Sequence, residues 1–199
     1  MSGALSAAPW RPPGFAIAWA GVPDGMPRRE VAWSLLADLA GNPTDLRLRN
    51  PCPRCGGPHG PVVMAGTRLR GSVAYAGRFA VAAVVFAPGL RGFGIDAEMR
   101  TDPVRDAAGW GGIPGPGARG TVRGWTRIEA ALKADGRGLT VDPAAVSVRE
   151  RPDGRWSAAL PEREDLVEGW DVAAPAELVV SAAIVRHGSG GSAAVSIQR

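Results

Sequence analysis

The chain has 199 residues, of which 45% are hydrophobic and 21% are charged, as in a globular protein long enough to bury a core. Its formal net charge of +4 favours anionic partners without specifying one. No apolar run approaches the length of a membrane span, residues 1–10 lack a signal-peptide pattern and two cysteines cannot form a disulfide scaffold, so we expect a cytoplasmic protein with no membrane partner.

The first predicted elements are a strand over residues 15–19 and a helix that begins at Pro27 and ends near Gly41. Arg28 and Arg29 occupy the first turn of this helix, where cations oppose the helix dipole. Their position suggests a bound anion nearby, but two solvated surface arginines would explain it equally well.

Residues 51–60 contain Cys52, Cys55 and His59. A C-x-x-C pair followed by histidine could hold zinc, but a structural zinc site needs four ligands and the sequence has no second cysteine pair. A redox motif is the other alternative, and the strand-then-helix context of such motifs is missing. We favour neither interpretation from the sequence.

The segment of residues 71–77 precedes a predicted strand over residues 79–86, whose apolar run indicates burial. Pro88 and Gly89 form a turn, so we expect residues 93–98 to be the antiparallel neighbour of 79–86. Residues two apart in a strand share a face, which places Asp96 and Glu98 on one side.

Residues 102–120 lack periodicity and are predicted to form a loop that exposes Trp110. Thr121 is a candidate N-cap for a helix that ends at Gly136 or Gly138. Its apolar stripe of Trp125, Ile128 and Leu132 would pack on a sheet.

Glu129 and Lys133 lie four residues apart on this helix and would form one charged edge. Lys133 is the only lysine in the chain, among 23 basic residues, and a compact ammonium can settle between phosphate oxygens. With Asp96 and Glu98, this edge would suit a divalent cation that holds phosphate oxygens. The alternative is a solvated Glu–Lys pair on a helix surface.

After the helix, residues 146–148 and 155–158 form a predicted hairpin around Pro152–Gly154. Residues 178–184 form another predicted strand, and residues 193–197 a short last one. Each half of the chain therefore combines strands with one long helix.

The stretches Gly94-Ile95-Asp96-Ala97-Glu98 and Trp125-Thr126-Arg127-Ile128-Glu129-Ala130-Ala131-Leu132-Lys133 resemble the signature pair of the Sfp-type 4′-phosphopantetheinyl transferases, a G-[IV]-D-x-E strand followed by a W-x-x-K-E-A-x-x-K helix. Residues 52–60 are similar to a C-P-x-C-G-x-x-H-G connector of small bacterial members. The chain departs from the pattern at Ile128, where many relatives have lysine, and at Tyr75, where the family's S-x-S-H-x-G motif has histidine.

The resemblance implies an α+β fold, a pseudo-dimer of two similar halves, each a small antiparallel sheet packed on a long helix. Residues 1–92 would form the coenzyme adenosine and phosphate side, and residues 93–199 the metal and catalytic side, with the site at the seam. The implied enzyme is a monomer that transfers 4′-phosphopantetheine from coenzyme A to a serine of an apo acyl or peptidyl carrier protein.

The resemblance also implies roles for individual residues. Mg²⁺, or Mn²⁺, would be held by Asp96, Glu98 and Glu129, and catalysis would involve Glu129 and Lys133. The expected coenzyme contacts are Arg28, Arg29, Arg47, Arg49, His59, Ser72 and Tyr75. The main alternative is a degenerate member that binds coenzyme A or a carrier protein without transfer. A basic nucleic-acid-binding module is disfavoured because no recognition motif supports it, and we expect no nucleic-acid partner.

Overall fold

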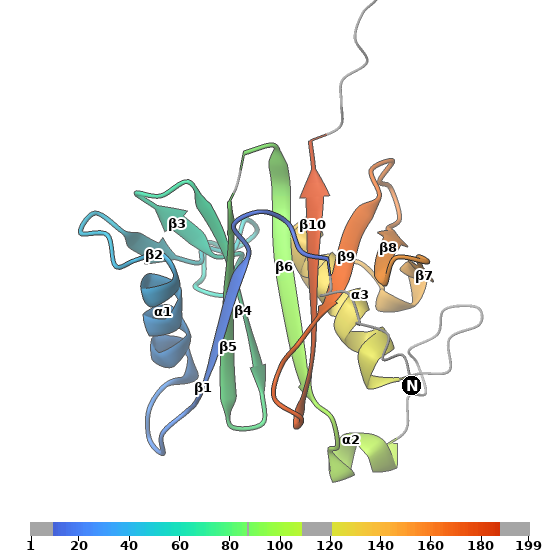
Figure 1. Ribbon diagram of the computed structural model, residues 1–199, viewed down its shortest axis with the longest axis horizontal. Helices are drawn as coiled ribbons and strands as arrows, with labels where there is room; N and C mark the ends of the chain where they lie inside the picture. Colours follow the sequence, from blue (N-terminus) through green and yellow to red (C-terminus); the bar gives the residue numbers. More distant parts are fainter. Residues whose placement is uncertain (1–9, 87, 109–120, 188–199) are drawn as a thin grey trace, which may run out of the picture.

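The computed structural model describes residues 10–86, 88–108 and 121–187, which form antiparallel sheets with few helices, an α+β arrangement (Figure 1). The elements in chain order are β1 (Ala16–Gly21), α1 (Arg28–Leu39), β2 (Arg47–Arg49), β3 (Val63–Ala65), β4 (Leu69–Ala76), β5 (Phe79–Phe86), β6 (Leu90–Met99), α2 (Pro103–Ala108), α3 (Val122–Asp135), two 3-10 turns (Gly138–Thr140 and Pro143–Ala145), β7 (Ser147–Glu150), β8 (Arg155–Ala159), β9 (Val167–Val172) and β10 (Leu178–Arg186).

The first sheet has the order β1-β5-β4, and helix α1 packs on one of its faces. Its central strand, β5, consists of apolar residues buried on both sides, which the apolar run predicted. Leu36 of α1 is fully buried against Ala82 and Val84 of this strand. The small sheet β2-β3 lies beside α1 (Figure 1).

The second sheet has the order β6-β10-β9-β8-β7, and helix α3 packs across it. The predicted hairpin is confirmed as β7 and β8, and the predicted strand over residues 178–184 lies within β10. Helix α3 covers an apolar cluster that includes Leu132, Trp156 and Val167. Burying side chains of this size contributes about 1.5–3 kcal/mol each, which fixes the helix on the sheet.

The two sheets meet along β4 and β6 and share the largest apolar cluster. Val81 contributes from the first sheet, together with Phe15 just before β1, and Ile95 and Ile184 contribute from the second. At the junction, the backbone N–H of Ile95 donates a hydrogen bond to the Ser72 hydroxyl at 3.0 Å. The Arg70 guanidinium of β4 also donates to the Leu90 carbonyl oxygen of β6, at 3.1 Å. Side-chain hydrogen bonds therefore join two strands that belong to different sheets.

One strand pairing expected from the sequence is wrong, because β6 pairs with β10 and not with β5. Both edges of β5 are already occupied, by β1 on one side and β4 on the other. The turn at residues 88–89 therefore carries the chain from the first sheet into the second.

The elements that were not predicted include the strands β2, β3 and β9 and the short helix α2 within the expected loop. Trp110 and the strand expected at residues 193–197 lie outside the described residues. None of the helices in the described ranges is both long enough and apolar enough to cross a bilayer.

Candidate functional site

The site begins on one face of β6, where residues two apart share a side. A side-chain carbon at Gly92 would collide with the carbonyl oxygen of Ala134, and one at Gly94 would lie 2.7 Å from the Cβ of Lys133. These two glycines therefore allow the backbone of α3 to approach the strand closely. Asp96 and Glu98 continue the same face beyond them.

Helix α3 is held at both ends, as the sequence predicted. The Thr121 hydroxyl caps its N-terminus by accepting from the Gly124 N–H at 2.9 Å, and Gly136 ends it in a left-handed conformation at φ 87°. The predicted apolar stripe is correct for Ile128 and Leu132, which are buried under the helix. It is wrong for Trp125, which is half-buried beside Glu98, because its indole N–H has a carboxylate partner there.

Asp96 and Lys133 form an ion pair across the strand–helix contact, with Lys133 Nζ 2.7 Å from Asp96 Oδ1. Asp96 is only 7% exposed. Burial raises the pKa of the Asp96 carboxyl, and the Lys133 ammonium opposes that change. The only lysine of the chain is thus placed against a carboxylate that the sequence assigned to a metal ion.

Glu98 accepts hydrogen bonds from two side chains that lie on different helices. The Trp125 indole N–H of α3 donates at 3.2 Å, and the Arg105 guanidinium of α2 donates at 3.3 Å. Burial, followed by the negative charge of Asp96, raises the pKa of Glu98, while Arg105 lowers it. The Glu98 carboxylate is oriented by both helices.

Glu129 makes no side-chain hydrogen bond or ion pair with any residue in the described ranges. Its pKa is raised by burial and by the charges of Asp96 and then Glu98, and lowered by Lys133. The four predicted side chains are therefore close enough to influence one another's charge, although they come from segments far apart in the sequence.

The donor set suits a hard cation, and one atom has no other partner. Asp96 Oδ2 is buried and has no hydrogen-bond partner among the described residues, so a cation there would satisfy it. The three carboxylates do not form a tight ligand group as they stand. In the described part of the chain, the group of ligand atoms that all lie within 4.8 Å of one another is Cys52, Cys55 and His59.

A buried polar network fixes α3 in register over the second sheet. Asp96, Ser181 and Asp171 occupy one row across β6, β10 and β9. The hydroxyls of Ser181 and Thr126 lie 3.0 Å apart, and Ser181 donates to Asp171 at 3.1 Å. Arg127 makes two hydrogen bonds to Asp171, at 3.0 and 2.8 Å. This network holds the segment that carries Glu129 and Lys133.

Positive charges gather around Tyr75 at the edge of the first sheet. Burial raises the pKa of the Tyr75 phenol, and the charges of Arg29, Lys133 and Arg28 lower it. The four side chains come from α1, β4 and α3. Arg29 itself donates to the Pro58 carbonyl oxygen, and Lys133 is paired with Asp96. In the described ranges, no hydrogen bond or ion pair joins these cations to the Tyr75 side chain.

The other predicted coenzyme contacts are placed differently. Ser72 is three residues from Tyr75 and so lies on the opposite face of β4, where its hydroxyl accepts from Ile95. Arg47 and Arg49 are exposed on β2, and Arg47 donates to the carbonyl oxygens of Thr44 and Leu46. His59 Nε2 lies 3.4 Å from Cys55 Sγ. No described contact joins these side chains to Tyr75.

Ile128, where the resemblance expects lysine, is 6% exposed and belongs to the apolar cluster under α3. It follows that position 128 contributes packing and no charge to the site.

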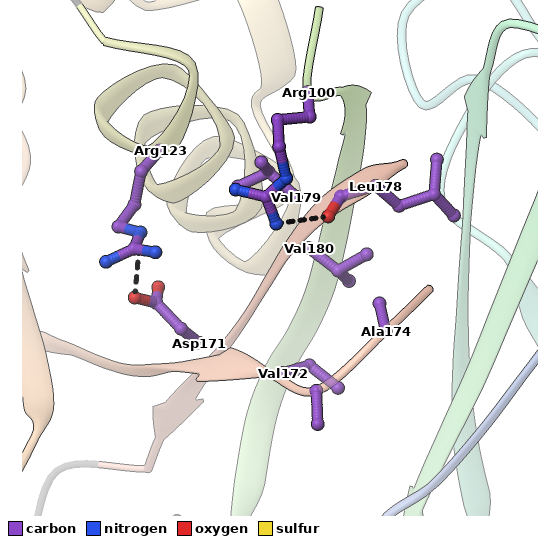
Figure 2. Close-up of a pocket in the computed structure, with 9 residues that line it drawn as sticks. Arg100, Arg123, Asp171, Val172, Ala174, Leu178, Val179 and Val180 are labelled. Atoms are coloured by element: carbon purple, nitrogen blue, oxygen red, sulfur yellow. Dashed lines mark hydrogen bonds and ion pairs between the residues drawn. The ribbon is translucent and has the colours of Figure 1, made fainter. Parts of the chain in front are cut away.

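A separate hollow lies beside the polar network (Figure 2). Residues of β9 and β10 line it together with Arg100 and Arg123, both of which already have partners: Arg100 donates to the Leu178 carbonyl at 3.2 Å, and Arg123 lies 3.5 Å from Asp171. Neither Asp96 nor Glu129 lines this hollow.

Two residues that support the site were missed from the sequence. Arg105 lay in a predicted loop, although Asp102-Pro103 is a helix-start signal and Asp102 caps α2 by accepting from Val104 and Arg105 at 3.0 Å. Ser181 has no such signal, because only the pairing of β10 with β6 places it beside Asp96.

No protein-family model and no curated protein sequence matches this chain.

Proposed function

We propose that this protein is an Sfp-type 4′-phosphopantetheinyl transferase, which moves 4′-phosphopantetheine from coenzyme A to a serine of an apo carrier protein. The observation that carries the proposal is the grouping of Asp96, Glu98, Glu129 and Lys133, in which each carboxylate is influenced by at least one of the other three side chains. The resemblance assigned these same four positions to the metal and the catalytic pair.

The acidic residues would hold Mg²⁺, or Mn²⁺, and the metal would supply neutralisation of charge on the pyrophosphate. Arg28, Arg29 and Tyr75 would bind the phosphate groups of the coenzyme from the first sheet. The raised pKa of Glu129 makes this carboxyl the best candidate to accept the proton of the attacking serine.

In the reaction, the serine oxygen attacks the β-phosphorus of coenzyme A. The bond from this phosphorus to the bridging oxygen breaks, and adenosine 3′,5′-bisphosphate leaves. The serine proton passes to Glu129. Lys133 would stabilise charge on the leaving oxygen.

The second candidate is a protein that binds coenzyme A or a carrier protein without transfer. Two observations favour it: Ile128 is buried and uncharged, and Tyr75 has no positive charge at neutral pH. Both remove cations that the resemblance expects near the pyrophosphate.

The experiment that separates the two is incubation of the protein with coenzyme A, Mg²⁺ and a panel of apo carrier proteins, followed by intact-mass measurement. Transfer adds roughly 340 Da to a carrier and none to the same carrier with its acceptor serine replaced by alanine. Binding of coenzyme A in calorimetry with no mass change on any carrier would support the binding-only protein. Neither binding nor transfer would contradict both candidates.

A further inference from the structure

The segment between β2 and β3 brings together three soft metal ligands that the proposed transfer reaction does not use. The ligand atoms of Cys52, Cys55 and His59 all lie within 4.8 Å of one another. Cys55 Sγ and His59 Nε2 are 3.4 Å apart. The resemblance gave His59 to the adenosine of the coenzyme, but its ring lies against the cysteines.

The backbone of this segment is closed into a compact turn. The Gly56 N–H donates to the Cys52 carbonyl at 2.8 Å, and the Cys52 N–H donates to the Gly57 carbonyl at 2.7 Å. Gly56 has φ 71°, a left-handed conformation that glycine adopts without strain. A side-chain carbon at Gly60 would collide with the Pro51 carbonyl oxygen. The turn therefore requires glycine at position 60, where the backbone passes close to Pro51.

The turn is also attached to helix α1 and to the residue that follows β2. The Pro58 carbonyl oxygen accepts from Arg29 at 2.6 Å and from the Asn50 amide at 2.9 Å. The Gly60 N–H donates to the Asn50 carbonyl at 2.8 Å. These bonds fix both ends of the turn, so the three ligands are held in place before any ion binds.

One of the sulfurs accepts local hydrogen bonds, and the other two ligand side chains are exposed. Backbone hydrogen bonds from Arg54 and Cys55, in that order, lower the pKa of the Cys52 thiol from 9.0 to about 7. Cys55 and His59 are exposed, so an ion can reach them.

Two sulfurs and an imidazole are the donor set of zinc and other soft or borderline metals, and not of Mg²⁺. We propose that Cys52, Cys55 and His59 bind one zinc ion, whose fourth position is open to water or another external ligand. No further His, Cys, Asp or Glu of the described ranges joins the group. This site is separate from the acidic site of Asp96, and zinc binding does not depend on the proposed transfer activity.

The test uses the full chain, purified without a nickel or cobalt column and kept reduced. Elemental analysis should find about one zinc per chain. Zinc should be lost in Cys52→Ser, Cys55→Ser and His59→Ala. It should be kept in Arg54→Ala, which changes the same turn but leaves every ligand and backbone donor, and in Asp96→Asn, which changes the acidic site.

A second measurement avoids dependence on how the variants fold. Cobalt added to the zinc-free wild-type chain should give sulfur-to-cobalt charge-transfer absorption and the visible bands of a tetrahedral ion. Zinc should displace the cobalt with a Kd below about 1 µM, and should raise the Tm of the metal-free wild-type chain.

A reduced wild-type chain that holds no zinc and gives no cobalt spectrum would overturn the proposal. So would a Cys52–Cys55 disulfide in the chain isolated under native conditions, which would indicate redox chemistry. Zinc retained by all three ligand variants would place the ion elsewhere and overturn the assignment.

Discussion

Lys133 Nζ and Asp96 Oδ1 lie 2.7 Å apart, and they belong to a helix and a strand separated by 37 positions. The contact is possible because Gly94, next to both, has no side chain to keep the helix away from the strand. The ion pair neutralises a buried carboxylate whose Oδ2 atom has no hydrogen-bond partner among the described residues. A metal ion at Asp96 would take over this role and release Lys133 toward the substrate.

The first prediction concerns the carboxylates of β6. Asp96→Asn and Glu98→Gln each remove a negative charge while keeping the side-chain shape, so each should lower the turnover of carrier modification by about 100-fold or more. Circular dichroism should show a preserved fold. Glu164→Gln, at an exposed carboxylate in the turn between β8 and β9, should behave as wild type. Near-wild-type turnover in either β6 variant would contradict the assignment of that carboxylate as a metal ligand.

The second prediction concerns the shape of the cation at position 133. Lys133→Arg keeps the charge but replaces a point-like ammonium with a planar guanidinium in a position where the Cβ already packs against Gly94. Turnover should fall by about 100-fold, with little change in urea denaturation. Arg186→Lys is the matched exchange at an exposed pair with Glu168 and should have no effect on turnover. If the Lys133→Arg variant is as active as the wild type, the Asp96–Lys133 ion pair has only a structural role.

The third prediction concerns the close approach of α3 and β6. Gly94→Ala introduces a carbon that would lie 2.7 Å from the Cβ of Lys133 and collide with the Ala130 carbonyl oxygen. The helix must shift, and the free energy of unfolding should fall by about 1–3 kcal/mol. Turnover should also fall, because the shift moves Glu129 and Lys133 relative to Asp96.

The control for this variant is Gly21→Ala at the end of β1, where a side-chain carbon meets nothing within 4 Å and the backbone is not left-handed. Its free energy of unfolding in urea should match that of the wild type. Equal stabilities for Gly94→Ala and the wild type would show that the two elements are not in close contact.

The fourth prediction concerns pH. Burial and the neighbouring carboxylates raise the pKa of Glu129 above 4.5 in the folded chain. The folded chain therefore binds this proton more tightly than the unfolded chain, so the contribution to stability is greatest below about pH 4.5 and is lost as pH rises through the raised pKa. Gln cannot ionise, so the Glu129→Gln variant does not lose this stability as pH rises. Its free energy of unfolding at pH 7 should exceed that of the wild type by on the order of 1 kcal/mol.

The measurement is urea denaturation between pH 4.5 and 8 with a chelator present. The stability difference between Glu129→Gln and the wild type should grow with pH, whereas Glu164→Gln should show no such trend. If the stability difference between Glu129→Gln and the wild type is constant across this range, the surroundings do not raise the pKa of the Glu129 carboxyl. Added Mg²⁺ should stabilise the wild type and not the Glu129→Gln variant, because only the wild type keeps all three carboxylates.

Much of the local structure was predictable, because short-range rules determine it. The cap at Thr121, the glycine end of α3, the β7–β8 hairpin and the shared face of Asp96 and Glu98 all follow from residue type and spacing. The partner of β6 was not predictable in this way. A turn at residues 88–89 fits a hairpin equally well, and the outcome depends on β1 and β4 occupying both edges of β5.

The site was predictable as a set of residues but not as a set of contacts. Strand and helix periods indicated that Asp96, Glu98, Glu129 and Lys133 could face one another. They could not indicate that Lys133 pairs with Asp96, which depends on how closely α3 approaches the glycines of β6. Strand β9 was missed because Glu168, Gly169 and Asp171 interrupt its apolar pattern, and its pairing with β8 and β10 makes it a strand.

The hydrogen bond from the Ile95 N–H to the Ser72 hydroxyl lies where the two sheets could separate by local opening. It bridges β4 and β6, which belong to separate sheets and lack a backbone ladder between them. Each sheet keeps its own helix and its own cluster of apolar side chains. Opening of this border would separate Arg28, Arg29 and Tyr75 from Lys133, and it would also expose the apolar cluster that the two sheets share. An anion that contacts all four side chains would hold the two sheets together. Its binding should slow hydrogen exchange at the Ile95 amide more than at amides in the interior of either sheet.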